Sequence, residues 1–83
     1  MYRIALSHHD TDRRRITPRH RDTAHTLGEA IGKVRECLPG VDLGGLVEGE
    51  VNASINRVND FRCDVPSAGA DGGEWRVVIA PMM

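Results

Sequence analysis

Residues 26–38 read Thr-Leu-Gly-Glu-Ala-Ile-Gly-Lys-Val-Arg-Glu-Cys-Leu, and this stretch decides the fold class. Thr26 and Glu29 match a capping box, in which the threonine hydroxyl satisfies a free amide of the first helical turn. The apolar residues recur at helical spacing and form one stripe: Leu27, Ala30, Ile31, Val34 and Leu38. Pro39-Gly40 ends the helix. A helix with one apolar stripe needs a second layer to pack against.

Alternating apolar and polar residues predict strands on both sides of this helix. The pattern is present in residues 2–6, 61–65 and 74–80. Residues 47–56 alternate as well and predict a long strand with an acidic, amide-rich outer face. The spacing of Val47, Val51, Ile55 and Val58 also fits a helix, so a helical alternative stays open for this segment, with strand preferred.

The predicted element order is strand, helix, strand, strand, strand. Short links after the helix favour antiparallel pairing, so we expect a two-layer α+β fold with one amphipathic helix on a three- to four-stranded antiparallel sheet. The length of 83 residues allows one domain, residues 1–83. Within it we expect a mobile polar loop at residues 8–22, extended at most around residues 16–20, and a flexible Gly-rich connection at residues 66–73.

The charge of the chain is divided between its two halves. Residues 1–35 hold eight basic and four acidic residues, a net of +4, whereas residues 36–83 hold three basic and eight acidic, a net of −5. Charge asymmetry of this kind bears on partners and steering. We therefore expect contact with another macromolecule.

Two segments are candidates for that contact. The first is acidic and consists of Glu48 and Glu50 on the predicted long strand together with Asp60 and Asp64. The second is the run Arg13, Arg14 and Arg15 in the predicted loop. Nearby aspartates, a pI of about 6.4 and the lack of a stacking pair favour a solvated loop, or a loop that contacts an acidic protein surface, over nucleic-acid binding by this run.

Catalytic and metal-binding signatures are weak. His8, His9 and Asp10 lie near Asp12, His20, Asp22 and His25, but they lack the fixed spacing of a metal site on firm elements. Cys37 and Cys63 lack metal-pair spacing and are read as small buried hydrophobic residues, with a disulfide as the alternative. We expect no enzyme activity, no metal and no cofactor.

The amino terminus lacks the charged start and apolar run of a signal peptide, and no stretch reaches the ~20 apolar residues of a membrane span. We therefore expect a cytoplasmic protein with no membrane partner. Its expected partner is another protein or a ribonucleoprotein complex. Homodimerisation stays open.

The order of a short strand (Tyr2 to Leu6), a polar loop, a capped helix (Thr26 to Leu38) and a strand beginning at Gly45-Leu46-Val47 resembles that of small phage-encoded anti-CRISPR proteins. This resemblance implies a non-enzymatic inhibitor in the host cytoplasm. It would bind a Cas protein or a crRNA-guided complex and block it by steric and electrostatic occlusion. The alternative is a nucleic-acid-associated regulator, such as an antitoxin or small repressor, that uses the Arg-rich loop. A third hypothesis is a metal-dependent or catalytic protein built around His8, His9 and Asp10.

Overall fold

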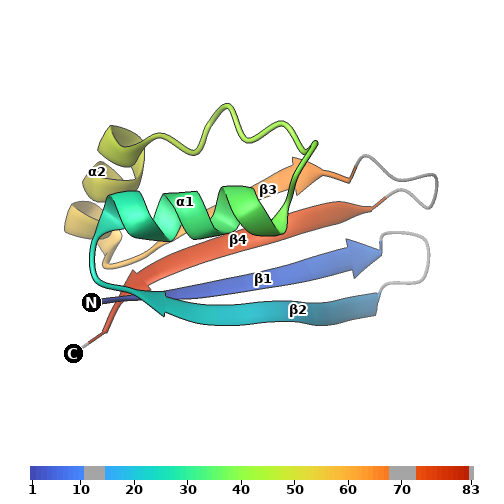
Figure 1. Cartoon of the computed structure of the whole chain (residues 1–83), viewed down its shortest axis with the longest axis horizontal. Helices are drawn as coiled ribbons and strands as arrows, with labels where there is room; N and C mark the ends of the chain where they lie inside the picture. Colours follow the sequence, from blue (N-terminus) through green and yellow to red (C-terminus); the bar gives the residue numbers. More distant parts are fainter. Residues whose placement is uncertain (11–14, 68–72, 83) are drawn as a thin grey trace.

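The protein folds into a four-stranded antiparallel sheet with two helices on one of its faces (Figure 1). The computed structural model describes residues 1–10, 15–67 and 73–82. The strand order is β2-β1-β4-β3, so the two terminal strands lie side by side in the centre of the sheet. The α+β class and the antiparallel sheet predicted above are confirmed. The elements are β1 (Tyr2–Asp10), β2 (Arg15–Ala24), α1 (Leu27–Cys37), α2 (Glu48–Val58), β3 (Phe61–Pro66) and β4 (Glu74–Pro81).

The core lies between the sheet and the helices. Helix α1 packs over β1 and β2, and α2 packs over β3 and β4. The central strands contribute Ile4, Leu6, Val77 and Ile79, which are almost completely buried. The stripe predicted for α1 faces this layer, with Ala30 and Val34 fully buried. No described helix is long or apolar enough to span a membrane.

Helix α1 begins as its sequence predicts. Thr26 is the N-cap, and its hydroxyl accepts a hydrogen bond of 3.1 Å from the backbone amide of Glu29. The Glu29 carboxylate accepts a hydrogen bond of 3.3 Å from the backbone amide of His25, one residue earlier than a standard capping box requires. At the other end, the Leu38 amide donates to the Val34 carbonyl, and the chain then turns at Gly40, where φ is +80°.

The loop predicted at residues 8–22 is wrong for the residues that the structure describes there. Residues 8–10 continue β1, and residues 15–24 form β2, which pairs with β1 along its length. The reason is that β2 is an edge strand whose side chains are mostly exposed, with Ala24 its one buried residue. The strand is held by backbone pairing, so its sequence does not need to alternate between apolar and polar residues, and the pattern that predicts a strand is missing. The remaining residues of that predicted loop, 11–14, lie outside the described part of the chain.

The strand preferred for residues 47–56 is also wrong, because Glu48–Val58 is the helix α2. Its acidic residues, Glu48 and Glu50, occupy the first turn, where the helix dipole favours negative charge. Asn59 ends the helix in the left-handed conformation, with φ at +64°. Val51 is buried, whereas Val47 is exposed, so the apolar alternation of this segment did not mark one buried face.

The link between the two helices is held by buried leucines and a side-chain hydrogen bond, and the link between β3 and β4 by a backbone hydrogen bond. Between the helices, Leu43 and Leu46 are buried, and Arg35 of α1 donates a hydrogen bond of 3.1 Å to the Leu46 carbonyl. Between β3 and β4, the Ser67 amide donates to the Gly73 carbonyl at 3.0 Å. The middle of the predicted Gly-rich connection, residues 68–72, lies outside the described residues.

Candidate functional site

One face of the sheet carries no helix, because both helices lie on the other side (Figure 1). Side chains alternate along each strand, and the positions opposite to the buried core residues face away from the helices. We call this surface the open face. Its residues are Arg3, Ala5, Ser7 and His9 of β1; Ile16, Pro18, Arg21 and Thr23 of β2; Arg62, Asp64 and Pro66 of β3; and Glu74, Arg76, Val78 and Ala80 of β4.

One cross-strand row of the open face runs through all four strands. Ala5 of β1 pairs with Arg21 of β2 on one side and with Val78 of β4 on the other, and Val78 pairs with Arg62 of β3. The row therefore has small apolar residues in the middle and an arginine at each edge. A depression of about 220 Å³ lies over it, lined by Arg3, Ile4, Ala5, Arg21 and Val78.

Each strand contributes one arginine to the open face: Arg3, Arg21, Arg62 and Arg76. Arg76 donates a hydrogen bond of 2.9 Å to Asp64. This bond lowers the pKa of the Asp64 carboxyl and raises the pKa of the Arg76 guanidinium. The guanidinium groups of Arg3, Arg21 and Arg62 are exposed and have no hydrogen bond or ion pair to a described residue. The charge of Arg62 also helps to lower the pKa of Asp64. One end of the open face thus presents three cations without a hydrogen bond or ion pair to a described residue, around an apolar floor.

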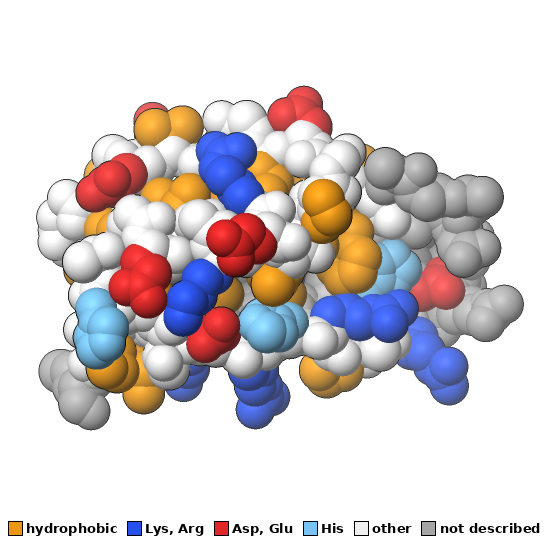
Figure 2. All heavy atoms as spheres, in the orientation of Figure 1, with side chains coloured by type: hydrophobic (Ala, Val, Ile, Leu, Met, Phe, Trp, Pro, Cys, Tyr) orange, Lys and Arg blue, Asp and Glu red, His pale blue; other side chains and the backbone are white. Residues whose placement is uncertain are grey.

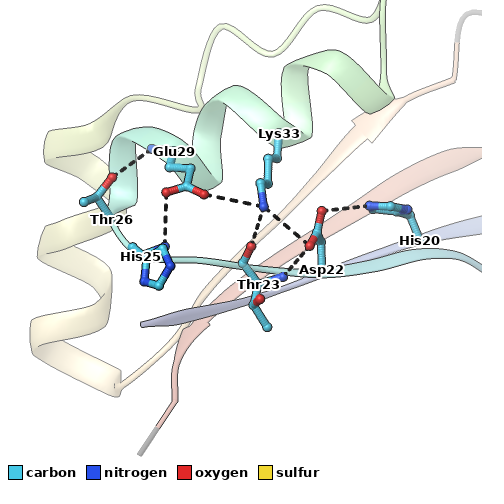
Figure 3. A network of polar contacts seen from close by, with 7 residues as sticks. All are labelled: His20, Asp22, Thr23, His25, Thr26, Glu29 and Lys33. Atoms are coloured by element: carbon cyan, nitrogen blue, oxygen red, sulfur yellow. Dashed lines mark hydrogen bonds and ion pairs between the residues drawn. The ribbon is translucent and has the colours of Figure 1, made fainter.

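The helix side has a different charge pattern. Figure 2 shows this side, where acidic and basic side chains are interspersed. A polar network joins α1 to β2 there (Figure 3). Lys33 of α1 donates to the Thr23 carbonyl at 2.7 Å and lies 3.5 Å from both Asp22 and Glu29. Lys33 offsets one of the two carboxylates, and its charge is engaged within the network, so this network is a structural tie between α1 and β2.

A second cluster surrounds Trp75, the single tryptophan of the chain. The β1–β2 register shifts between Leu6 and Ser7, so β2 contains an additional residue, Arg19. The Arg19 guanidinium lies 5.9 Å from the Trp75 ring centre, on the helix side. The His8 ring meets Trp75 edge-on, with the ring centres 4.9 Å apart. The cluster stabilises this end of the sheet through ring and cation–π contacts.

The acidic candidates predicted from the sequence do not form one surface. Glu48 and Glu50 lie in the first turn of α2 on the helix side. Asp60 follows α2 and is half-buried, and its carbonyl accepts a hydrogen bond of 2.7 Å from the Ser54 hydroxyl. Asp64 lies on the open face and is bound to Arg76. The predicted acidic strand face does not exist, because its residues belong to a helix.

Of the basic candidates, the structure describes Arg15 alone, and it does not belong to the open face. Arg15 begins β2 opposite Asp10, at a position that alternates toward the helix side. Arg13 and Arg14 lie outside the described residues. The arginines that do converge, on the open face, were not singled out by the sequence analysis. For Arg3 the placement could have been predicted, since the alternation of residues 2–6 puts this residue on the face opposite to Ile4.

The groups considered for metal or thiol chemistry are dispersed. His8 and His9 are adjacent on β1 and therefore point to opposite faces of the sheet. Among the described residues, no three His, Cys, Asp or Glu side chains come together in a way that could hold a metal. Cys37 is exposed, which corrects the prediction of two buried cysteines, and Cys63 is half-buried. Both are free thiols, and burial together with the Asp64 charge raises the pKa of Cys63.

Comparison of the chain with protein-family models, with curated proteins and with solved structures finds no match in any of the three.

Proposed function

We propose that this protein is a small non-enzymatic protein-binding module whose contact surface is the open face. The observation that carries the proposal is the placement of Arg3, Arg21 and Arg62 around Ala5 and Val78, with no hydrogen bond or ion pair from these three guanidiniums to a described carboxylate. Of the three, Arg62 lies near enough to Asp64 for its charge to lower the pKa of that carboxyl. Unpaired arginines around small apolar residues fit the composition of protein interfaces, where arginine is enriched. The complementary partner is a protein surface with acidic side chains around an apolar centre.

A protein fits this surface better than a nucleic acid. All three aromatic residues of the chain, Tyr2, Phe61 and Trp75, occupy helix-side positions, so the open face has no aromatic platform on which bases could stack. Asp64 and Glu74 also belong to this face and interrupt its positive charge, so it has no continuous basic stripe for a phosphate backbone to follow. The overall net charge of −1 gives no long-range attraction for a polyanion.

Binding by such a module would act through occlusion of a partner surface. The narrower form of the proposal is an anti-CRISPR-like inhibitor from a phage or mobile element that occupies an acidic surface of a Cas protein or of a crRNA-guided complex. Support for this narrower form comes from the order of elements along the chain. One element of that order differs, because the helix α2 stands where a strand was expected after residue 45. The sign of the proposed contact also changes, from the acidic residues predicted from the sequence to a basic face of the sheet.

A pull-down with matched charge-reversal variants tests the proposed function. The bait proteins are the wild type, a triple variant with Arg3→Glu, Arg21→Glu and Arg62→Glu, and a control with Glu48→Lys and Glu50→Lys on the helix side. We expect a stoichiometric protein partner that survives nuclease, is lost from the triple variant and is kept by the control. A partner lost from the control instead would move the contact to α2 and overturn the assignment of the open face.

The second candidate function is a nucleic-acid-associated regulator, favoured by one observation. Arg15, Arg19 and Arg21 all lie on the edge strand β2, whose outer side is exposed. Binding through this edge predicts bound material that is lost with nuclease and an affinity that falls steeply as salt rises.

A further inference from the structure

We propose that the segment received by the open face is an α-helix of the partner, with an apolar stripe flanked on both sides by acidic residues. This inference rests on the proposed function, namely that the open face binds a protein. It adds the secondary structure and the residue pattern of the bound segment.

The first argument is the width of the row between Arg21 and Arg62. These residues are separated by three strand-to-strand steps, since Ala5 and Val78 lie between them. At ~4.8 Å per step the two backbones are ~14 Å apart. An α-helix with its side chains is ~10–12 Å across and fits between the two arginines. An extended strand is narrower, so it would contact either Arg21 or Arg62 and not both at once.

The second argument is the apolar floor that lies between Arg21 and Arg62. Ala5 and Val78 are half-buried and provide the floor, whereas Ala80, which pairs with Arg3, is 6% exposed and adds little surface to it. These side chains are short and apolar, so they let a helix approach the two central strands closely and bury its own apolar stripe against them. The floor follows β1 and β4, because its residues belong to these strands. A docked helix would therefore lie along the strands with one flank toward Arg21 and the other toward Arg62.

The third argument is charge. Arg21 and Arg62 flank the floor, and Arg3 lies at one end of it. None of the three guanidiniums makes a hydrogen bond or an ion pair to a described residue, although the charge of Arg62 also acts on Asp64. Each can form charge-assisted, bidentate hydrogen bonds with a carboxylate of the partner. On a helix, Asp or Glu residues on both sides of an apolar stripe would contact Arg21 and Arg62 at the same time. This pattern distinguishes the inferred segment from a generally acidic surface.

The chain itself does not offer such a helix to a second copy. The apolar stripe of α1 is buried in its own core, with Ala30 and Val34 fully covered. Helix α2 carries Glu48 and Glu50, but its Val51 is fully buried. Docking of either helix on another copy would require its release from the sheet. The inferred occupant is therefore a different protein.

Two synthetic peptides and an oligonucleotide test this inference without knowledge of the partner. The first peptide, of about 18 residues, places Leu at i, i+3, i+4 and i+7 with Glu on both flanks. The second has the same composition with Leu and Glu alternating at the period of a strand. The third probe is a thymidine oligonucleotide. Binding is measured by calorimetry and by amide chemical shifts of the ¹⁵N-labelled protein.

We expect the helical-pattern peptide to bind most tightly and to shift the amides of Ala5, Val78 and Ala80. Combined Arg21→Glu and Arg62→Glu should weaken this binding by about tenfold or more, ~1.4 kcal/mol. The control with Glu48→Lys and Glu50→Lys should bind within about twofold of the wild type. Unchanged shifts of the remaining amides in the double variant would verify that it is folded.

Three results would overturn the inference. Tighter binding of the alternating peptide would show that the open face takes an extended segment, and the proposed function would stand. Binding of neither peptide at these amides would exclude an acidic helix, and the pull-down would still decide whether a protein is bound. Tighter binding of the oligonucleotide at these amides would overturn both the helix and the protein partner.

Discussion

Lys33 of α1 and Asp22 of β2 are joined across the two layers of the fold, with the lysine Nζ 3.5 Å from the aspartate Oδ1 (Figure 3). The same Nζ donates a hydrogen bond of 2.7 Å to the backbone carbonyl of Thr23. Strand β2 has one buried side chain, Ala24, so burial contributes little to holding it. The contacts of Lys33 therefore add to the β1 pairing that keeps this edge strand in place.

Replacement of Lys33 tests this tie. We expect Lys33→Met to lower the free energy of unfolding by about 1 kcal/mol, mainly through the lost hydrogen bond to the Thr23 carbonyl. Glu36→Gln, on the exposed side of the same helix, is the control and should change it by less than ~0.5 kcal/mol. Urea unfolding followed by circular dichroism measures both. Equal midpoints for the two variants would show that β2 is held by backbone pairing alone.

The acid sensitivity of the fold should depend on Asp22. Its pKa is lowered, first by the hydrogen bond from the Thr23 amide and further by the charge of Lys33. A carboxyl with a lowered folded-state pKa stabilises the fold above its unfolded pKa, near 3.8, and this contribution is lost as pH falls through the folded value.

Asp22→Asn is therefore expected to be less stable than the wild type near neutral pH and to approach it in acid, below about pH 3.8. Urea midpoints measured across this range for both proteins give the difference directly. A stability gap that stays constant with pH would mean that the ionised carboxylate has no special role.

The loop between the helices offers a matched pair of neighbours. Leu46 is 1% exposed, whereas Val47 is 51% exposed. Leu46→Ala should destabilise the fold by about 2–5 kcal/mol, because it leaves a cavity under the loop. Val47→Ala should change stability by less than ~0.5 kcal/mol. Thermal unfolding separates these outcomes, and similar melting temperatures would place the loop outside the core.

How far the fold was predictable depended on where each element obtains its stability. Helix α1 was predicted because its cap and its buried stripe are both local in the sequence. Strand β2 was missed because it is held by pairing with β1, and no side-chain pattern records that pairing. For α2, the positions of Val51 and Ile55 fitted both periods, and the tertiary contacts of the helix decided between them.

The candidate site was less predictable than the fold, for a related reason. Arg3, Arg21 and Arg62 are up to 59 positions apart in the sequence, and the strand order β2-β1-β4-β3 brings them to one face. That order depends on the pairing of the first and last strands, which is a non-local contact. The hypothesis of an acidic contact surface also depended on residues 47–56 forming a strand. Because most of this segment is the helix α2, the acidic strand face does not form.

Two glycines should respond to alanine in opposite directions. Gly73 has a φ of +87°, and a Cβ there would lie 2.5 Å from the His9 carbonyl oxygen. We expect Gly73→Ala to destabilise the fold by about 1–3 kcal/mol. Gly32 lies inside α1 with open space around it, so Gly32→Ala should stabilise the fold by up to ~1 kcal/mol. A neutral Gly73→Ala would show that the β3–β4 connection can shift away from β1.

Asp64 gives the sharpest discrimination between the two charge hypotheses, because they predict opposite signs. If acidic residues form the contact, Asp64→Ala weakens binding of the partner. If the open face receives an acidic helix, the same substitution removes a repulsive carboxylate and frees Arg76, which Asp64 now holds at 2.9 Å. We therefore expect Asp64→Ala to tighten binding of the helical-pattern peptide by about three- to tenfold at low salt. Glu48→Ala, remote on α2, should leave the affinity within about twofold of the wild type. Calorimetric titrations at two salt concentrations measure whether Asp64→Ala tightens or weakens peptide binding and how far salt reduces the change. Weaker binding by Asp64→Ala would show that the acidic residues form the contact.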